Sequence, residues 1–380
     1  MLTNINTNTD KKRIHGIDCI RGLSIIRVIL LHICVHVPLG YSAISKLLPH
    51  KIFNIIFRSG YYGVMVFFVI SGFLITSNTI KRWGSIDNVP YKTFYFIRFA
   101  RIAPSLLALL LILSLLHILG IEWFVIQNTS LIQALFSALT FQVNWLEYQT
   151  NSHLPAAWDL LWSLSVEEMF YLFFPVICIF IKNRIIFIFV MLAFIALGPF
   201  ARTVFSTNDN WLDHSYLSCM DGIAIGCLAA LFATMATFNK DKILKWFLWS
   251  GIVMFSIVFF FRKLTYDIGL TKVGLKVTIL EVSIAFILIA IAKNQIQLPK
   301  LRFISSSLRW FGKNSYEIYL THMLIEIPLF ATFYLVQNSF VLSSLWCLAI
   351  VILCGLVGQI VSKYYSEPMN KVLRYKYLVK

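Results

Sequence analysis

Long apolar segments recur along the whole chain, and they constrain its fold more than any other feature. Each is about 20 residues long, the length at which an α-helix crosses the hydrocarbon core of a bilayer. Of the 380 residues, 59% are hydrophobic and only 13% are charged, which leaves too little polar surface for a water-soluble protein and too many apolar residues for a disordered one. The sequence therefore predicts an all-α, polytopic integral membrane protein.

We predict ten membrane spans, with a cytoplasmic N-terminal tail at 1–16, a membrane domain at 17–362 and a cytoplasmic C-terminal tail at 363–380. The first apolar segment follows a polar stretch and has no clear small-residue cleavage site, so we interpret it as an uncleaved span. The ten spans are expected near residues 17–38, 61–80, 97–119, 160–181, 185–204, 215–236, 243–261, 274–292, 313–336 and 342–362.

The distribution of Lys and Arg predicts the orientation of these spans. With both termini in the cytoplasm, twenty-three Lys and Arg residues fall in cytoplasmic segments and seven in external ones. Cytoplasmic loops collect such residues, so the bias favours this orientation in the cytoplasmic membrane and explains the net charge of +16 without nucleic-acid binding. The external loop 120–158 has no Lys or Arg, and its apolar stretch 131–143 is expected to lie on the membrane or fold back as a lid.

Residue spacing predicts neither a disulfide framework nor a metal site. The seven cysteines lie in apolar segments and form no CxxC pair. His32 and His36 are four residues apart, but no third ligand is placed beside them. We therefore expect no metal cofactor.

Ionisable residues inside the first span are the strongest functional signal, because a charge at membrane depth is costly. Arg21 and His32 are eleven residues apart, about three helical turns, so they share one helix face at a separation of about 16 Å. Asp18 precedes Arg21 by three residues and is its expected ion-pair partner. The alternative is that these groups only pack helices together.

Two further spans carry charged pairs. Arg98 and Arg101 share a face at the cytoplasmic end of the third span, where they either anchor the helix or form a fork for phosphates. Glu167 and Glu168 point about 100° apart in the fourth span, so we expect different roles for them. Glu167 is predicted to lie at the depth of His32, where a carboxylate would raise the basicity of the imidazole, whereas Glu168 is expected to pair with an arginine.

These residues lie in motifs that resemble those of the membrane acyltransferase-3 family, in the same order and over nearly the whole chain. Cys19 stands where glycine is usual and Met169 where glutamine is usual, and neither removes a group that chemistry would need. The matching segments are Asp18-Cys-Ile-Arg21-Gly22 running on to His32, Gly63 to Phe73 with its Ser71-Gly72, Arg98-Phe-Ala-Arg101-Ile-Ala-Pro104, Trp162 to Tyr171, Asp221-Gly-Ile-Ala-Ile-Gly226, Ser315 to His322, and Ser366-Glu367-Pro368.

The resemblance implies transfer of an acyl group, usually acetyl, from cytoplasmic acyl-CoA to a hydroxyl of an envelope glycan or glycolipid, such as a polysaccharide or lipopolysaccharide, on the outer side. His32 would act as a general base or as a covalent acyl carrier, and both roles stay open. The expected site residues are His32 and Glu167 for catalysis, Arg98, Arg101 and Arg21 for the acyl-CoA donor, and, as weaker candidates, Asp18, Glu168, Asp221 and His322.

Two other function classes stay open at this stage. A proton-coupled transporter would also have about ten spans and buried ionisable groups, but it should show repeated halves with matching broken helices, which the sequence does not. A non-enzymatic envelope protein would tolerate loss of Arg21 or His32. Some family members carry a C-terminal extracellular hydrolase-like domain, which this sequence lacks, so transfer to the acceptor directly or through a partner protein also stays open.

Overall fold

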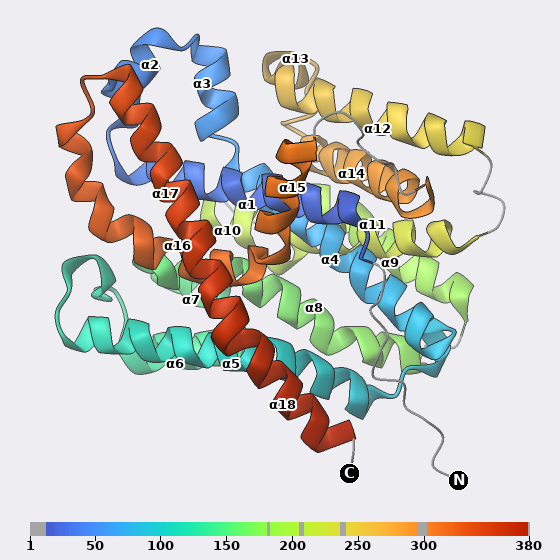
Figure 1. Cartoon of the computed structure of the whole chain (residues 1–380). Helices are drawn as coiled ribbons and strands as arrows, with labels where there is room; N and C mark the ends of the chain where they lie inside the picture. The colour runs from blue at the N-terminus through green and yellow to red at the C-terminus, as the bar shows by residue number, and fades with distance from the viewer. Residues whose placement is uncertain (1–12, 181–182, 205–208, 236–240, 295–301, 379–380) are drawn as a thin grey trace.

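The computed structural model describes residues 13–180, 183–204, 209–235, 241–294 and 302–378, which form helices and loops with no β-strand among them (Figure 1). Each of the ten predicted spans is a long helix. They are α1 (His15–His36), α4 (Gly60–Trp83), α5 (Tyr91–Ile118), α8 (Leu161–Phe180), α9 (Arg184–Ala201), α11 (Tyr216–Thr234), α12 (Asp241–Phe260), α14 (Leu275–Asn294), α16 (Ser315–Phe330) and α17 (Phe340–Val361).

Within the described residues, nine helices are long and apolar enough to cross a membrane, and α1, which carries Asp18, Arg21 and Arg27, falls outside these nine. The all-α, polytopic membrane fold is thus confirmed. Some basic residues used for the predicted orientation lie outside the described part of the chain, namely Lys11, Lys12, Lys182, Lys240, Lys300 and Lys380.

Shorter elements connect the long helices. The predicted loop 120–158 contains two helices, and the first of them exposes the apolar side chains of Ile132 and Phe136. That this first helix lies on the membrane surface stays a prediction. The shorter elements are η1 (Leu39–Tyr41), α2 (Ala43–Leu47), α3 (His50–Phe57), η2 (Ile86–Asn88), η3 (Glu122–Phe124), α6 (Leu131–Leu139), α7 (Val143–Thr150), η4 (Ala156–Trp158), α10 (Asp209–His214), α13 (Arg262–Asp267), α15 (Arg302–Lys313), η6 (Ala331–Leu335), the π-helical turn η7 (Ser362–Ser366) and α18 (Glu367–Leu378).

Helix α1 is held by close backbone contact with α15. A Cβ atom on Gly22 would lie 1.9 Å from the carbonyl oxygen of Leu308, and one on Gly312 would lie 1.8 Å from the carbonyl oxygen of Asp18. Only glycine allows two helix backbones to approach this closely, which is how small residues stabilise helix pairs in membranes. The α1–α15 contact therefore fixes the helix that carries Arg21 and His32.

Most of the segment assigned as the C-terminal tail is helix. Helix α17 continues through η7 into α18, which packs along α5 (Figure 1). The Tyr365 hydroxyl donates to the carbonyl oxygen of Pro104 at 3.1 Å, and Arg374 donates to that of Ile97 at 3.4 Å. This segment thereby forms one wall of the cavity described next.

Candidate active site

A cavity of about 800 Å³ lies between α1, α4, α5, α8, α16 and α18, at the end of the bundle where α1 and α5 begin. We call it the basic cavity, because its lining has more cationic than anionic side chains. The anionic ones are Glu167, Glu168 and Glu367. The cationic ones are Arg13, Arg21, Arg82, Arg98, Arg101, Lys313, Lys371 and Arg374. Five of the predicted site residues, from three different helices, thus line one cavity.

Arg98 and Arg101 both line the basic cavity, but their surroundings differ. The Arg98 guanidinium lies 3.7 Å from the centre of the Tyr171 ring and forms no ion pair with any described residue. The Nη1 atom of Arg101 lies 3.1 Å from Glu317 Oε1, and the buried Glu317 also accepts a 2.7 Å hydrogen bond from Ser366. Arg101 is therefore fixed by the protein, whereas no described carboxylate pairs with the Arg98 guanidinium.

The predicted Asp18–Arg21 ion pair is not formed within the 4.0 Å limit for such pairs, and Asp18 is nevertheless the main favourable charge near Arg21. Arg21 lines the basic cavity with no carboxylate of the described residues at that distance. Asp18 is 5% exposed, and its Oδ2 atom has no hydrogen-bond partner among them. The three-residue spacing places the two side chains on one helix face, but α15 packs against the backbone at Asp18.

Glu167 has partners other than the predicted one. Its Oε1 atom accepts hydrogen bonds from the hydroxyls of Ser71, at 2.6 Å, and Tyr171, and these two hydroxyls also contact each other. In the described structure it makes no hydrogen bond to His32, so the expected carboxylate–imidazole pair is not formed. Glu168 lines the same cavity without the ion pair to arginine that we expected.

His32 lies in a row of histidine rings. Its ring centre is 5.2 Å from that of His322 and 6.0 Å from that of His36. Nδ1 of the buried His322 lies 2.8 Å from the carbonyl oxygen of Tyr319, and a carbonyl only accepts, so this nitrogen carries the proton. The Nε2 atom of His322 is then an acceptor, and it has no hydrogen-bond partner among the described residues.

The histidine row lies between the basic cavity and a second one, although neither His32 nor His322 lines either cavity. At one end, the Tyr319 ring lies 5.8 Å from His322, and its hydroxyl shares a 2.6 Å hydrogen bond with Ser163; Tyr319 and Ser163 line the basic cavity. At the other end, His36 lines a cavity of about 390 Å³ together with residues of loop 120–158 such as Trp123. We call this second space the outer cavity, after the predicted external position of loop 120–158. His32 thus lies between two cavities at opposite ends of the row.

Asp221 does not line either cavity. Its two carboxylate oxygens accept hydrogen bonds from Arg202 at 2.6 and 3.1 Å, and one of them also accepts from Thr278 at 2.9 Å. Both partners of this ion pair are buried. This geometry indicates a structural role for Asp221, which we had expected as a weaker site candidate. The sequence analysis did not assign Glu317 to the site, although it is the carboxylate that forms the ion pair with Arg101. The only sequence feature that marked Glu317 as a candidate was its position inside a predicted span.

Fold and cavities together define a polytopic membrane protein with a row of histidines between its basic cavity and a second cavity. The chain belongs to the acyltransferase-3 family, because the family model described as "Acyltransferase domain" matches residues 14–360. This confirms the resemblance seen in the motifs.

The chain is also similar to curated proteins of Staphylococcus aureus. It is 25% identical to a protein of strain COL named "Putative O-acetyltransferase", over 82% of this chain and 50% of the relative. It is 26% identical to "O-acetyltransferase OatA" of strain NCTC 8325, over 94% of this chain and 57% of the relative. The chain therefore spans about half the length of the relatives it matches. No solved structure matches it.

Proposed function

We propose that this protein transfers an acyl group, acetyl by default, from acyl-CoA to a hydroxyl of an envelope glycan or glycolipid on the outer side of the cytoplasmic membrane. The observation that carries the proposal is the position of His32 between the basic cavity and the outer cavity. A donor in one cavity and an acceptor in the other would meet at the histidine row.

The basic cavity suits the phosphates of acyl-CoA. Guanidinium groups bind phosphate through paired N–H donors, and Arg98 and Arg21 have no protein carboxylate within 4.0 Å among the described residues. Arg101 adds positive charge at a fixed position. Because the twenty-three-to-seven bias of Lys and Arg favours a cytoplasmic position for this end of the bundle, the cavity would open to the compartment that contains CoA.

His32 supplies the acid–base group. As a general base it removes the proton of the acceptor hydroxyl, whose oxygen attacks the thioester carbonyl carbon; the C–S bond breaks, and the imidazolium returns the proton to the CoA thiolate. As a carrier, its ring nitrogen attacks the thioester first and releases CoA, and the hydroxyl then attacks the acyl-imidazole. His322, whose Nδ1 donates to Tyr319, offers Nε2 as the neighbouring acceptor in either route.

The names of the relatives support an oxygen atom as acceptor, since both describe O-acetyl transfer. The glycan nature of the acceptor and the acetyl-CoA donor rest on the family resemblance. We expect the enzyme to be a multi-pass protein of the cytoplasmic membrane with both termini inside.

The test compares cells that make the protein with cells that lack it. Mass spectrometry of their envelope glycans should find base-labile acetyl esters only where the protein is present, and purified protein should release free CoA thiol from acetyl-CoA when glycan is added. Equal acetyl ester in both strains, together with no thiol release, would contradict the proposal.

A further inference from the structure

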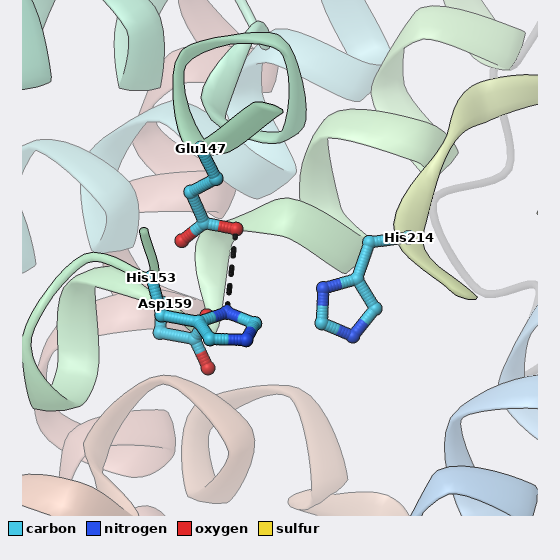
Figure 2. Close-up of side chains that lie close together, drawn as sticks. All are labelled: Glu147, His153, Asp159 and His214. Carbon is cyan, nitrogen blue, oxygen red and sulfur yellow. Dashed lines mark hydrogen bonds and ion pairs between the residues drawn. The ribbon is translucent and has the colours of Figure 1, made fainter. Parts of the chain in front are cut away.

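Four potential metal ligands meet at the end of the bundle that carries loop 120–158. They are Glu147 on α7, His153 after it, Asp159 next to η4, and His214 at the end of α10, and Figure 2 shows their side chains turned toward a common centre. One ligand atom from each lies within 4.8 Å of those from the other three. No second group of this kind occurs among the residues that the structure describes.

The distances already approach those of a metal site. The Nδ1 atom of His153 lies 3.1 Å from Asp159 Oδ1 and 3.9 Å from Glu147 Oε2 (Figure 2). Ligands of a tetrahedral zinc ion lie about 3.3 to 3.5 Å from one another, since each is about 2.0–2.1 Å from the metal. Inward shifts of the four side chains by about 1 Å would therefore bring their ligand atoms to tetrahedral spacing. The His153 side chain is half-exposed and has room for such a shift.

Two of the four side chains present buried atoms without hydrogen-bond partners in the described structure. Glu147 is 1% exposed; its Oε1 accepts a 3.0 Å hydrogen bond from the Leu154 N–H, while its Oε2 accepts none. Nδ1 of His214 is likewise buried and unpaired. Buried polar atoms normally have partners, so these two atoms point to a missing ligand.

The same two side chains are held in place by contacts outside the cluster. The His214 ring stacks on Trp162 with ring centres 3.9 Å apart, and its carbonyl oxygen accepts a 2.9 Å hydrogen bond from Asn144. Glu147 is fixed by the Leu154 N–H. Such supporting contacts orient ligands in metal sites and lower the reorganisation that binding requires.

We propose that Glu147, His153, Asp159 and His214 bind one Zn²⁺ ion. Two imidazole nitrogens and two carboxylate oxygens form a donor set that zinc accepts in tetrahedral geometry, and imidazole disfavours calcium and magnesium. When the metal binds Nδ1 of His153, it displaces the proton between this nitrogen and Asp159, which moves to Nε2 of a neutral ring or is lost to water from a cationic one.

The bound ion would join segments that are distant in sequence. It connects α7 and the loop after it with α10 and with the start of α8. His153 also lines the outer cavity, together with Leu154, Pro155 and Ala156. The zinc ion therefore stabilises the wall of the cavity in which the acceptor would bind, and its role is structural. The spacing of these residues in the sequence gave no signal, which is why we expected no metal there.

The experiment measures zinc in the full-length protein, purified in detergent without a polyhistidine tag. After incubation with ZnSO₄ and desalting, elemental analysis should find about one zinc per chain. Glu147→Gln, His153→Ala and the double variant should retain less than a tenth of that, whereas His50→Ala, which removes an exposed histidine of α3, should retain all of it. Zinc should raise the melting temperature of the parent and of His50→Ala only.

A parent protein that retains no more zinc than its ligand variants would overturn the proposal, whether that amount is near zero or near one per chain. The His153→Ala result decides the case if the double variant does not fold, because this side chain is 49% exposed and its loss leaves no cavity in the core. Neither readout depends on acyl transfer, so the outcome is independent of the proposed activity.

Discussion

Arg98→Lys is the substitution that tests donor binding in the basic cavity most directly. The Arg98 guanidinium stacks over Tyr171 at 3.7 Å and has no ion-pair partner among the described residues, so its N–H groups are available to a phosphate. Lysine keeps the positive charge, and with it the predicted orientation in the membrane. It loses the planar pair of donors and the stacking on the ring.

The expected size of the effect follows from the contact that is lost. A hydrogen bond to a charged group contributes about 1.5–3 kcal/mol, so the Kd for acetyl-CoA should rise by about 10-fold to 150-fold. Arg101→Lys should behave differently, because Arg101 forms an ion pair with the fully buried Glu317. We expect this second variant to lower the melting temperature as well as the affinity, and the double variant to bind at least about tenfold more weakly than the parent.

Isothermal titration calorimetry of acetyl-CoA binding to detergent-purified protein measures these affinities. Arg184→Lys is the matched control, since Arg184 starts α9, donates to the Leu231 carbonyl oxygen and does not line the basic cavity. Unchanged affinity in folded Arg98→Lys would refute the phosphate-binding role. The donor site would then move to the basic segment Lys293–Lys313, part of which lies outside the described residues.

Three further predictions follow from the site and the fold. His32→Ala should insert at normal levels but lose about 100-fold or more of the acyl transfer, which is what a positioned general base contributes; activity above about a tenth of the parent's would contradict its role. A membrane-impermeant maleimide should label Gln127→Cys in intact cells but not Asn88→Cys, and the reverse pattern would overturn the predicted orientation. Asp221→Asn leaves Arg202 buried without its carboxylate, so it should lower the free energy of unfolding by about 3–5 kcal/mol without changing acetyl-CoA affinity; an unchanged melting temperature would show that the ion pair is not structural.

The membrane helices could be predicted from the sequence because span length and hydropathy are local properties. All ten predicted spans correspond to helices, with ends that differ by a few residues. Short amphipathic elements were harder to predict. Helix α15 lies between the predicted spans 274–292 and 313–336, where we predicted no helix, yet its Gly312 lies against the backbone of α1. Only the neighbouring helix reveals why that glycine is required.

The site could be predicted in part. Motif positions led to Arg21, Arg98, Arg101 and the two glutamates, and these residues do line one cavity. Their partners could not be predicted, because helical spacing gives the face of a residue on its own helix and not the helix that packs there. The His322 ring beside His32 and the Glu317 carboxylate beside Arg101 both belong to α16.

The contact between Gly22 and Leu308, and between Gly312 and Asp18, has a consequence for how an acyl group would cross the bilayer. Backbones this close leave no room for α1 to slide or rotate against α15, so α1 cannot shuttle the group from one side to the other by moving alone. Under the proposed function His32 is then a stationary transfer point, approached by each substrate from its own side. Under that function only the acyl group would pass between the two compartments, and neither whole substrate would cross the bilayer.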